Sequence, residues 1–217
     1  MTLTRHALTL LLTTSALALA AGGGETPLPK DLPPYGADRP IPPLSIAQRT
    51  LPNGLTIWLV NRPGFPKVTT YLAVRGGTAQ DPAARQGLAN LMAGLLNEGT
   101  TTRTSKQLAE ELQTIGGELS AFASADAVFV YGTSLSSGLP TLISLLADVT
   151  RHPSFPEKEV ELAKANTLQG LLAQEPQPAF TANRAFQAAV FGTHPYHFAS
   201  ITPEVVKATT PELLRAL

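Results

Sequence analysis

Few side chains in this sequence could carry acid–base, nucleophilic or metal chemistry. The chain has four histidines and no cysteine, which excludes thiol nucleophiles, disulfides and cysteine-type metal sites. No Gly-x-Ser-x-Gly sequence is present, so the nucleophile turn typical of many serine hydrolases is missing. A phosphate-binding loop is not indicated either, because no Lys-Ser/Thr pair follows the glycine run Gly22–Gly24.

The histidines do not form a convincing metal site. His194 and His197 lie three positions apart and could share one face of a helix, which is a spacing used by metal ligands. Pro195 lies between them, however, and predicts a turn instead of a helix. His152 precedes Pro153 at an expected helix end, where a cation interacts favourably with the helix dipole. We therefore expect structural roles for these residues.

The clustered carboxylates also have a structural interpretation. Glu157, Glu159 and Glu161 are close in sequence, and paired carboxylates can do acid–base chemistry. They fall near the predicted N-terminus of a long helix, where negative charge stabilises the helix dipole. We favour the dipole interpretation over a paired-carboxylate site.

The segment Ala83–Asn97 is predicted to be an amphipathic helix with an unusual second face. Its apolar residues recur at helical spacing, and they are Leu88, Leu91, Met92, Leu95 and Leu96. The opposite face of the same helix carries Asn90, Ala93, Gly94 and Asn97. By itself, a helix with one apolar and one small or polar face is common and assigns no function.

The composition bounds the class of protein. The 217 residues include 16 basic and 16 acidic side chains, only 15% are charged, and no basic stripe is visible. This balance argues against binding to nucleic acid through phosphate neutralisation. The hydrophobic fraction of 43% is ordinary for a globular domain and can fill one core.

The N-terminal residues are typical of export. Arg5 and His6 precede an apolar run over residues 7–21, and Ala18-Leu19-Ala20 has the small-x-small form of a signal-peptidase site. A membrane anchor is the alternative, but about 15 apolar residues are few for a span. We therefore predict a signal peptide at 1–21, no stable membrane anchor, and a periplasmic or extracellular protein. A proline-rich linker at 22–45 and one domain at 46–217 follow.

The predicted elements of the domain favour an α+β fold with a largely antiparallel sheet. An Asn53-Gly54 turn predicts a hairpin. The expected strands are 48–50, 56–60, 68–75, 118–124 and 127–135, and the expected helices are 83–97, 105–115, 139–151, 156–173 and 179–191. A further helix capped by Thr210 stops after two turns, which is marginal alone. We interpret this end as a truncation, with a genuine short C-terminus as the alternative.

Taken together, these landmarks resemble the insulinase (pitrilysin) family. Two of these landmarks lie near the start and just after the end of the first predicted helix, and they are Gly87-Leu88-Ala89 and Glu98-Gly99-Thr100. Further landmarks follow in order, and they are Gly116-Gly117-Glu118-Leu119-Ser120-Ala121, Pro153-Ser154-Phe155-Pro156 and Gly192-Thr193-His194-Pro195-Tyr196. The resemblance covers about residues 48–217. It implies a two-layer α/β half-domain like that of the mitochondrial processing peptidases.

The same resemblance identifies a zinc motif that has lost its donors. The family's inverted His-x-x-Glu-His motif falls on Asn90, Ala93 and Gly94, and its distant glutamate ligand falls on Gly170. An amide is a poor zinc donor, and alanine and glycine side chains offer none. Gly94 also costs about 1 kcal/mol inside a helix relative to alanine. We expect no catalytic residue and no zinc in this chain.

The resemblance also implies a substrate strand at Ser120, Ala121 and Phe122. Family members commonly have an Asn-Ala pair there, and serine replaces the asparagine. This strand could add an extended peptide at its edge. An ordinary core strand, with Phe122 packed inside, is the equally weighted alternative.

The leading interpretation is an exported, inactive family member. The resemblance implies a heterodimer with a zinc-bearing homologue, the two chains enclosing a peptide. A structural or assembly protein with no peptide role remains open. A minor alternative is an active metallopeptidase with unrecognised ligands.

Overall fold

The computed structural model describes residues 36, 43–62 and 64–217. The predicted signal peptide at 1–21 and most of the linker at 22–45 lie outside the described residues. The chain divides into two compact units, with the boundary between Asn61 and Arg62. Among the described residues, no helix combines the length and the apolar character needed to cross a membrane.

The first unit contains the predicted hairpin. Strand β1 (Ile46–Thr50) pairs antiparallel with β2 (Thr56–Val60), and Thr50 lies opposite Thr56. The turn forms because Gly54 adopts a φ of 86°, a value that glycine tolerates without strain. The Oδ1 atom of Asn53 accepts a hydrogen bond from the backbone N–H of Leu55 at 3.2 Å. The Asn-Gly prediction is therefore confirmed.

The second unit is built on a three-stranded antiparallel sheet. Its strands are β3 (Lys67–Arg75), β4 (Glu118–Ala123) and β5 (Ala127–Leu135), in the order β3-β5-β4. The central strand β5 pairs with both neighbours. Among the described strands, β4 pairs only with β5, so the backbone groups along its other edge have no strand partner. Tyr71 lies opposite Tyr131 on one side, and Phe122 lies opposite Phe129 on the other.

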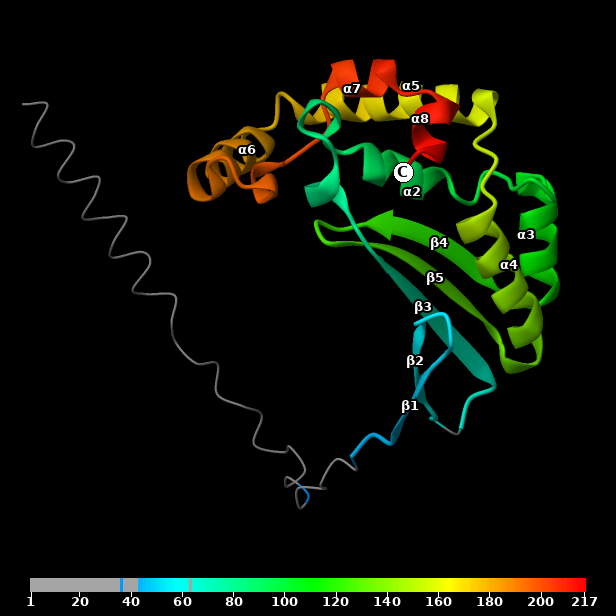
Figure 1. The fold of residues 1–217 in the computed structure, drawn as a ribbon. Helices are drawn as coiled ribbons and strands as arrows, with labels where there is room; N and C mark the ends of the chain where they lie inside the picture. The colour runs from blue at the N-terminus through cyan, green and yellow to red at the C-terminus, as the bar shows by residue number, and fades with distance from the viewer. Residues whose placement is uncertain (1–35, 37–42, 63) are drawn as a thin grey trace, which may run out of the picture. The chain divides into compact units, whose positions relative to one another are not determined.

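Seven α-helices belong to the described part of this unit. They are α2 (Leu88–Leu95), α3 (Ser105–Thr114), α4 (Leu139–Arg151), α5 (Glu157–Gln174), α6 (Pro178–Phe191), α7 (Pro203–Ala208) and α8 (Pro211–Arg215). Figure 1 shows α2 directly over the sheet, with α5 and α7 farther out on the same side. The predicted α+β class, with helices packed on a largely antiparallel sheet, is confirmed.

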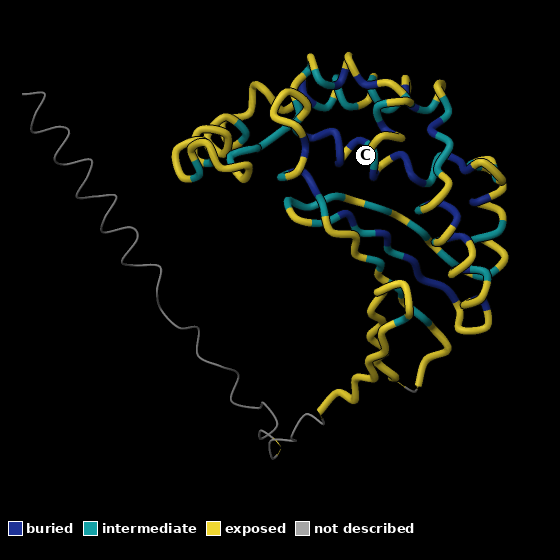
Figure 2. Tube along the Cα trace, viewed as in Figure 1, coloured by how far each residue is buried: buried dark blue, intermediate teal, exposed yellow. Residues whose placement is uncertain are grey.

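The core lies between the sheet and these helices. Residues at 0–3% exposure from six helices and strands pack in one cluster, and they include Leu88, Leu108, Val130, Leu145, Val160 and Leu214. Burying side chains of this size stabilises the fold by about 1.5–3 kcal/mol each. Figure 2 shows the buried residues concentrated in α2, α4 and β5, whereas α6 is exposed or half-buried along its length.

Helix α2 begins later than its hydrophobic pattern predicts. The predicted range was 83–97, but residues 83–85 form a short 3-10 turn and α2 starts at Leu88. Gly87 interrupts the helix with a φ of 92°. The buried Asp81 carboxylate accepts hydrogen bonds from the backbone N–H groups of Gly87 at 2.8 Å and Ala89 at 3.2 Å. Asp81 thus caps the helix from outside it, satisfying donors that a helix start leaves free.

The other predicted helices and strands lie within two residues of their observed bounds. Thr104 caps α3 and forms a reciprocal capping box with Gln107. Thr210 caps α8, as predicted. The sequence pattern missed α7, which is too short to show a clear hydrophobic period.

A buried carboxylate joins the loop after α2 to helix α4. Asp148 Oδ2 accepts hydrogen bonds from the hydroxyls of Thr100 and Thr102, both at 2.8 Å, and from Arg103 at 2.7 Å. Burial by itself raises the pKa of Asp148, but these bonds and one from His152 outweigh burial and lower the pKa to about 2. The ionised form is therefore stabilised in the folded state.

We predict that Asp148→Asn lowers the free energy of unfolding at pH 7 by about 2 kcal/mol. This value follows from the fall in the Asp148 pKa from 3.8 to about 2 on folding, at 1.36 kcal/mol per pKa unit. Because the folded-state pKa is depressed, the stabilisation is complete above about pH 4. It is lost as the pH falls through about 2. Urea unfolding at pH 7 and pH 3 should show the difference between wild type and variant shrinking at the lower pH.

The matched control is Asp126→Asn, the same chemical change at an exposed position. Asp126 accepts a hydrogen bond from Tyr196 at 2.7 Å in a solvent-exposed setting, so its loss should cost at most about 1 kcal/mol. Equal losses in the two variants would contradict a special role for the Asp148 network.

Candidate functional site

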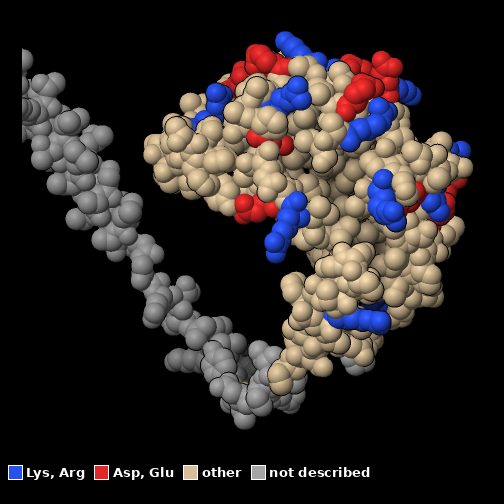
Figure 3. Space-filling view, in the orientation of Figure 1, with Lys and Arg blue, Asp and Glu red and all other residues tan. Residues whose placement is uncertain are grey.

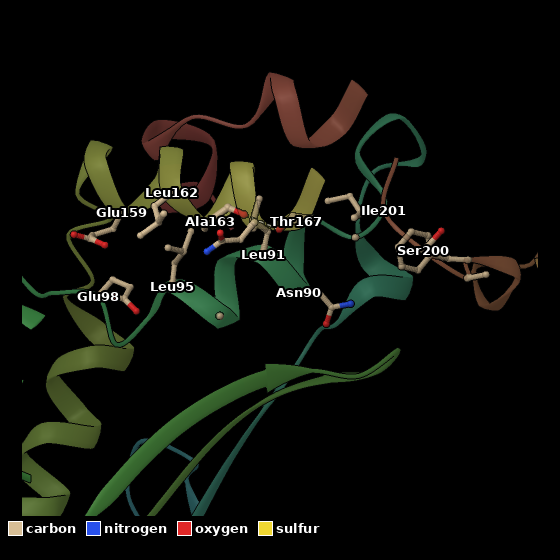
Figure 4. Close-up of a pocket in the computed structure, with 15 residues that line it drawn as sticks. Asn90, Leu91, Leu95, Glu98, Glu159, Leu162, Ala163, Thr167, Ser200 and Ile201 are labelled. Atoms are coloured by element: carbon tan, nitrogen blue, oxygen red, sulfur yellow. Dashed lines mark hydrogen bonds between the residues drawn. The ribbon is translucent and has the colours of Figure 1, made fainter. Parts of the chain in front are cut away.

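The predicted site positions on α2 divide between two environments. Asn90 and Gly94 are exposed and line a cavity of about 480 Å³ between α2 and α5, which we call the α2–α5 groove (Figure 4). Ala93 is only 1% exposed and is buried in the core. The sequence places Ala93 on the same helix face as Asn90 and Gly94, opposite the leucines, but the structure buries Ala93 and leaves Asn90 and Gly94 exposed.

The physical reason is that α2 is covered on two sides. The sheet contacts it through β4, and α5 and α8 contact it as well. A helix in this position does not have one buried and one solvent-facing half. Asn97 illustrates the point, because its side-chain amide donates a hydrogen bond of 2.7 Å to the carbonyl of Leu119 in β4. The Asn97 Oδ1 atom is buried and has no hydrogen-bond partner among the described residues.

The fourth position of the predicted metal set lies on α5. Gly170 is half-buried and does not line the α2–α5 groove. A Cβ atom built on Gly94 or on Gly170 meets no heavy atom within 4 Å. Neither glycine is therefore required by a close contact. Side chains would fit at both positions.

The residues present at these four positions do not fit a zinc ion. Zinc needs three or four nitrogen, sulfur or oxygen donors, and here a single neutral amide, that of Asn90, is available. Within the described ranges, no cluster of three or more histidine, aspartate or glutamate side chains could hold a metal ion. No metal-assisted step can be assigned to these residues.

The histidines have structural partners, which agrees with the sequence interpretation. His194 Nδ1 accepts a hydrogen bond from the backbone N–H of Tyr196, and this contact caps the 3-10 turn Pro195–His197. The ring of His197 contacts the carbonyl of His194 at 2.7 Å. His152 lies 3.3 Å from Asp148 at the end of α4. The predicted turn around Pro195 is confirmed.

The predicted substrate strand is an edge strand. Ser120 and Phe122 in β4 are exposed, and Phe122 stacks on Phe129 with ring centroids 5.1 Å apart. Ala121 points to the opposite face and packs against the core. The alternative of an internal core strand is not what is observed, because β4 ends the sheet and Phe122 is 50% exposed.

Sequence reasoning missed the two carboxylates of the groove. Glu98, in the loop after α2, and Glu159, in the first turn of α5, both line it. Burial, and then the negative charge of Glu159, raise the pKa of Glu98. The sequence predicts for Glu159 only a favourable interaction with the dipole of its helix. No pattern in the sequence indicates that it lies near Glu98. The buried Asp148, by contrast, could have been found, because it follows Leu145 by three residues on the apolar stripe of α4.

Charged side chains elsewhere are mixed. On the face drawn in Figure 3, lysine and arginine are interspersed with aspartate and glutamate over the helices, without one large basic patch. This distribution agrees with the balanced composition.

Comparison with known proteins supports these observations. The sequence model described as "Insulinase (Peptidase family M16)" matches residues 56–204. A protein of Mycobacterium leprae named as an uncharacterized zinc protease is 30% identical over 150 residues, which are 69% of this chain and 34% of that protein. A Rickettsia felis protein of similar name is 28% identical over 67% of this chain and 35% of its own length. The chain thus spans about a third of these relatives.

Two solved structures share the fold. A Pseudomonas fluorescens structure described as a peptidase M16 inactive domain has a TM-score of 0.75 and 25% identity, covering 80% of this chain and 42% of that one. Pitrilysin has a TM-score of 0.67 and 22% identity, covering 80% of this chain and 19% of its own, and this likeness concerns the fold alone.

We predict that restoring the three ligands restores zinc binding. The variant combines Asn90→His, Gly94→His and Gly170→Glu, and both glycine positions have open space for a side chain. We expect close to one zinc per chain in the triple variant, measured by atomic emission after dialysis. Far less than one is expected in the wild type.

The control replaces the third change by Gly170→Gln, which keeps the size of the side chain and removes the carboxylate. It should bind zinc at least tenfold more weakly than the triple variant. Stoichiometric zinc in the wild type would contradict the interpretation of these positions as empty.

Proposed function

Because the chain belongs to the insulinase family, peptidase family M16, we propose that it is a catalytically inactive member that binds extended peptides beside a zinc-bearing homologue. The observation that carries this proposal is the preserved fold around lost donors. The sheet and helices have the family arrangement, while the family resemblance assigns the zinc ligands and general base to Asn90, Ala93, Gly94 and Gly170, which offer no donor set for zinc.

Peptide binding is supported by the free edge of β4. An edge strand presents unpaired backbone N–H and C=O groups, which an extended peptide can satisfy by adding one more strand. Ser120 is small and Phe122 is half exposed on one face of this strand. They would contact alternate side chains of the peptide, while the backbone supplies most of the affinity.

Pairing is supported by the family relationship and by the share of the relatives that is matched. The matching zinc-protease relatives are about three times as long as the matched region. A chamber for peptides needs more surface than this unit offers. We propose a heterodimer in which the homologue holds the zinc and this chain contributes a wall and a binding strand. The neighbour described as an inactive domain is a precedent for the fold without the chemistry.

Export is part of the proposal. It is supported by the basic start and the apolar run of residues 7–21 in the sequence. The periplasm or the extracellular space is the proposed location.

If the peptide binds by pairing with the edge of β4, its affinity should depend strongly on its backbone N–H groups. A labelled peptide whose alternate backbone amides are N-methylated should bind at least tenfold more weakly than the unmodified peptide, because N-methylation removes donors and blocks strand pairing. Fluorescence anisotropy with the purified chain measures this ratio. Methylating the other set of amides, which point away from the strand, is the matched control and should change affinity far less.

The pairing proposal is tested by co-expression with a family homologue from the same organism that keeps His-x-x-Glu-His. We expect a one-to-one complex in size-exclusion chromatography and chelator-sensitive peptidase activity that needs the homologue's glutamate. Complex formation without any peptide binding would favour the structural role instead. Chelator-sensitive cleavage by this chain alone would overturn the proposal.

A further inference from the structure

The α2–α5 groove has a charged end and an apolar middle. Figure 4 shows Glu98 and Glu159 together at one end, and Ser200 and Ile201 toward the other. Leu95 and Leu162 lie between the two ends. The described lining includes no lysine and no arginine.

The two carboxylates lack a positive partner. Among the described residues, ion pairs are formed by Glu110, Glu111, Glu161 and Glu212, but none by Glu98 or Glu159. Both side chains are half-buried. Bringing two negative charges together on a half-buried surface is unfavourable. A cation placed between them would relieve this repulsion.

The rest of the groove suits the stem of a long side chain. Leu162 is 53% exposed although its neighbour Val160 is fully buried. Gly94 leaves open space, since an added Cβ would meet nothing within 4 Å. Lysine and arginine have an aliphatic stem that packs on apolar surface and a charged head that reaches a polar site.

We propose that the α2–α5 groove binds an arginine or lysine side chain of the peptide, with the cationic head between Glu98 and Glu159 and the stem against Leu95 and Leu162. This inference rests on the proposed function, that the chain binds peptides, and it names the class of peptide as one with a basic residue. Arginine fits better than lysine, because its planar guanidinium can donate to two carboxylates at once.

The test uses two labelled peptides that are identical except for one residue, arginine in one and its neutral isostere citrulline in the other. Fluorescence anisotropy measures both affinities for the purified full chain at low ionic strength. We expect the arginine peptide to bind about tenfold more tightly, and the ratio to fall below about twofold in the double variant Glu98→Gln with Glu159→Gln.

Two further variants make the result specific. Glu161→Gln removes a carboxylate of the same helix that is 62% exposed and pairs with Lys164, and it should keep the tenfold ratio. Gly94→Leu fills the groove without changing charge and should weaken the arginine peptide severalfold. Thermal unfolding confirms that each variant is folded.

The outcomes separate the two proposals. Equal binding of both peptides by the wild type would overturn the groove as a basic-residue site and leave peptide binding intact. A loss of the ratio in Glu161→Gln as large as in the double variant would overturn it too, because the effect would then be one of general charge. If neither peptide, nor any other extended peptide, binds, the proposed function itself is wrong.

Discussion

The placement of helix α2 is the constraint on which the rest of the described unit depends. The helix is packed between the sheet and α5, and five of its eight residues are buried. Asp81 caps its first turn through backbone hydrogen bonds. Beyond its last turn, Asn97 bonds to β4. Because both ends are fixed, the packing decides which α2 residues reach solvent. Asn90 and Gly94 are its exposed residues, and both line the groove.

The residues that stabilise this placement are largely separate from the positions that the family resemblance assigns to the zinc motif. The core uses side chains from six helices and strands and the loop residue Phe155. Of the four positions that the family resemblance assigns to the zinc motif, only Ala93 is buried in it. The Asp148 network fixes the loop after α2 without involving these positions. Substitutions at Gly94 and Gly170, where an added Cβ meets no heavy atom within 4 Å, should therefore cost little stability, unlike substitutions at the buried Ala93.

The same separation gives this chain a distinct surface chemistry in the α2–α5 groove. Where a metal site would require imidazole and carboxylate donors, the groove offers an open glycine and an apolar wall. Its two carboxylates lie at the far end, near the loop that follows α2. The sheet adds a free edge strand with one exposed aromatic ring. A surface of this kind can bind a chain and orient it, which needs shape and charge but no activated water.

The sequence by itself determined the class of fold and most element boundaries, and its family resemblance predicted zinc-motif positions without donors. Helical periodicity, the Asn53-Gly54 turn and the Thr104 cap are local signals that act within a few residues. The tertiary structure alone decided that Ala93 is buried, that Asp81 delays the start of α2, and that Glu98 and Glu159 line the same groove. Each of these facts depends on which segment covers which face. Such contacts join residues far apart in the chain, and local periodicity carries no information about them.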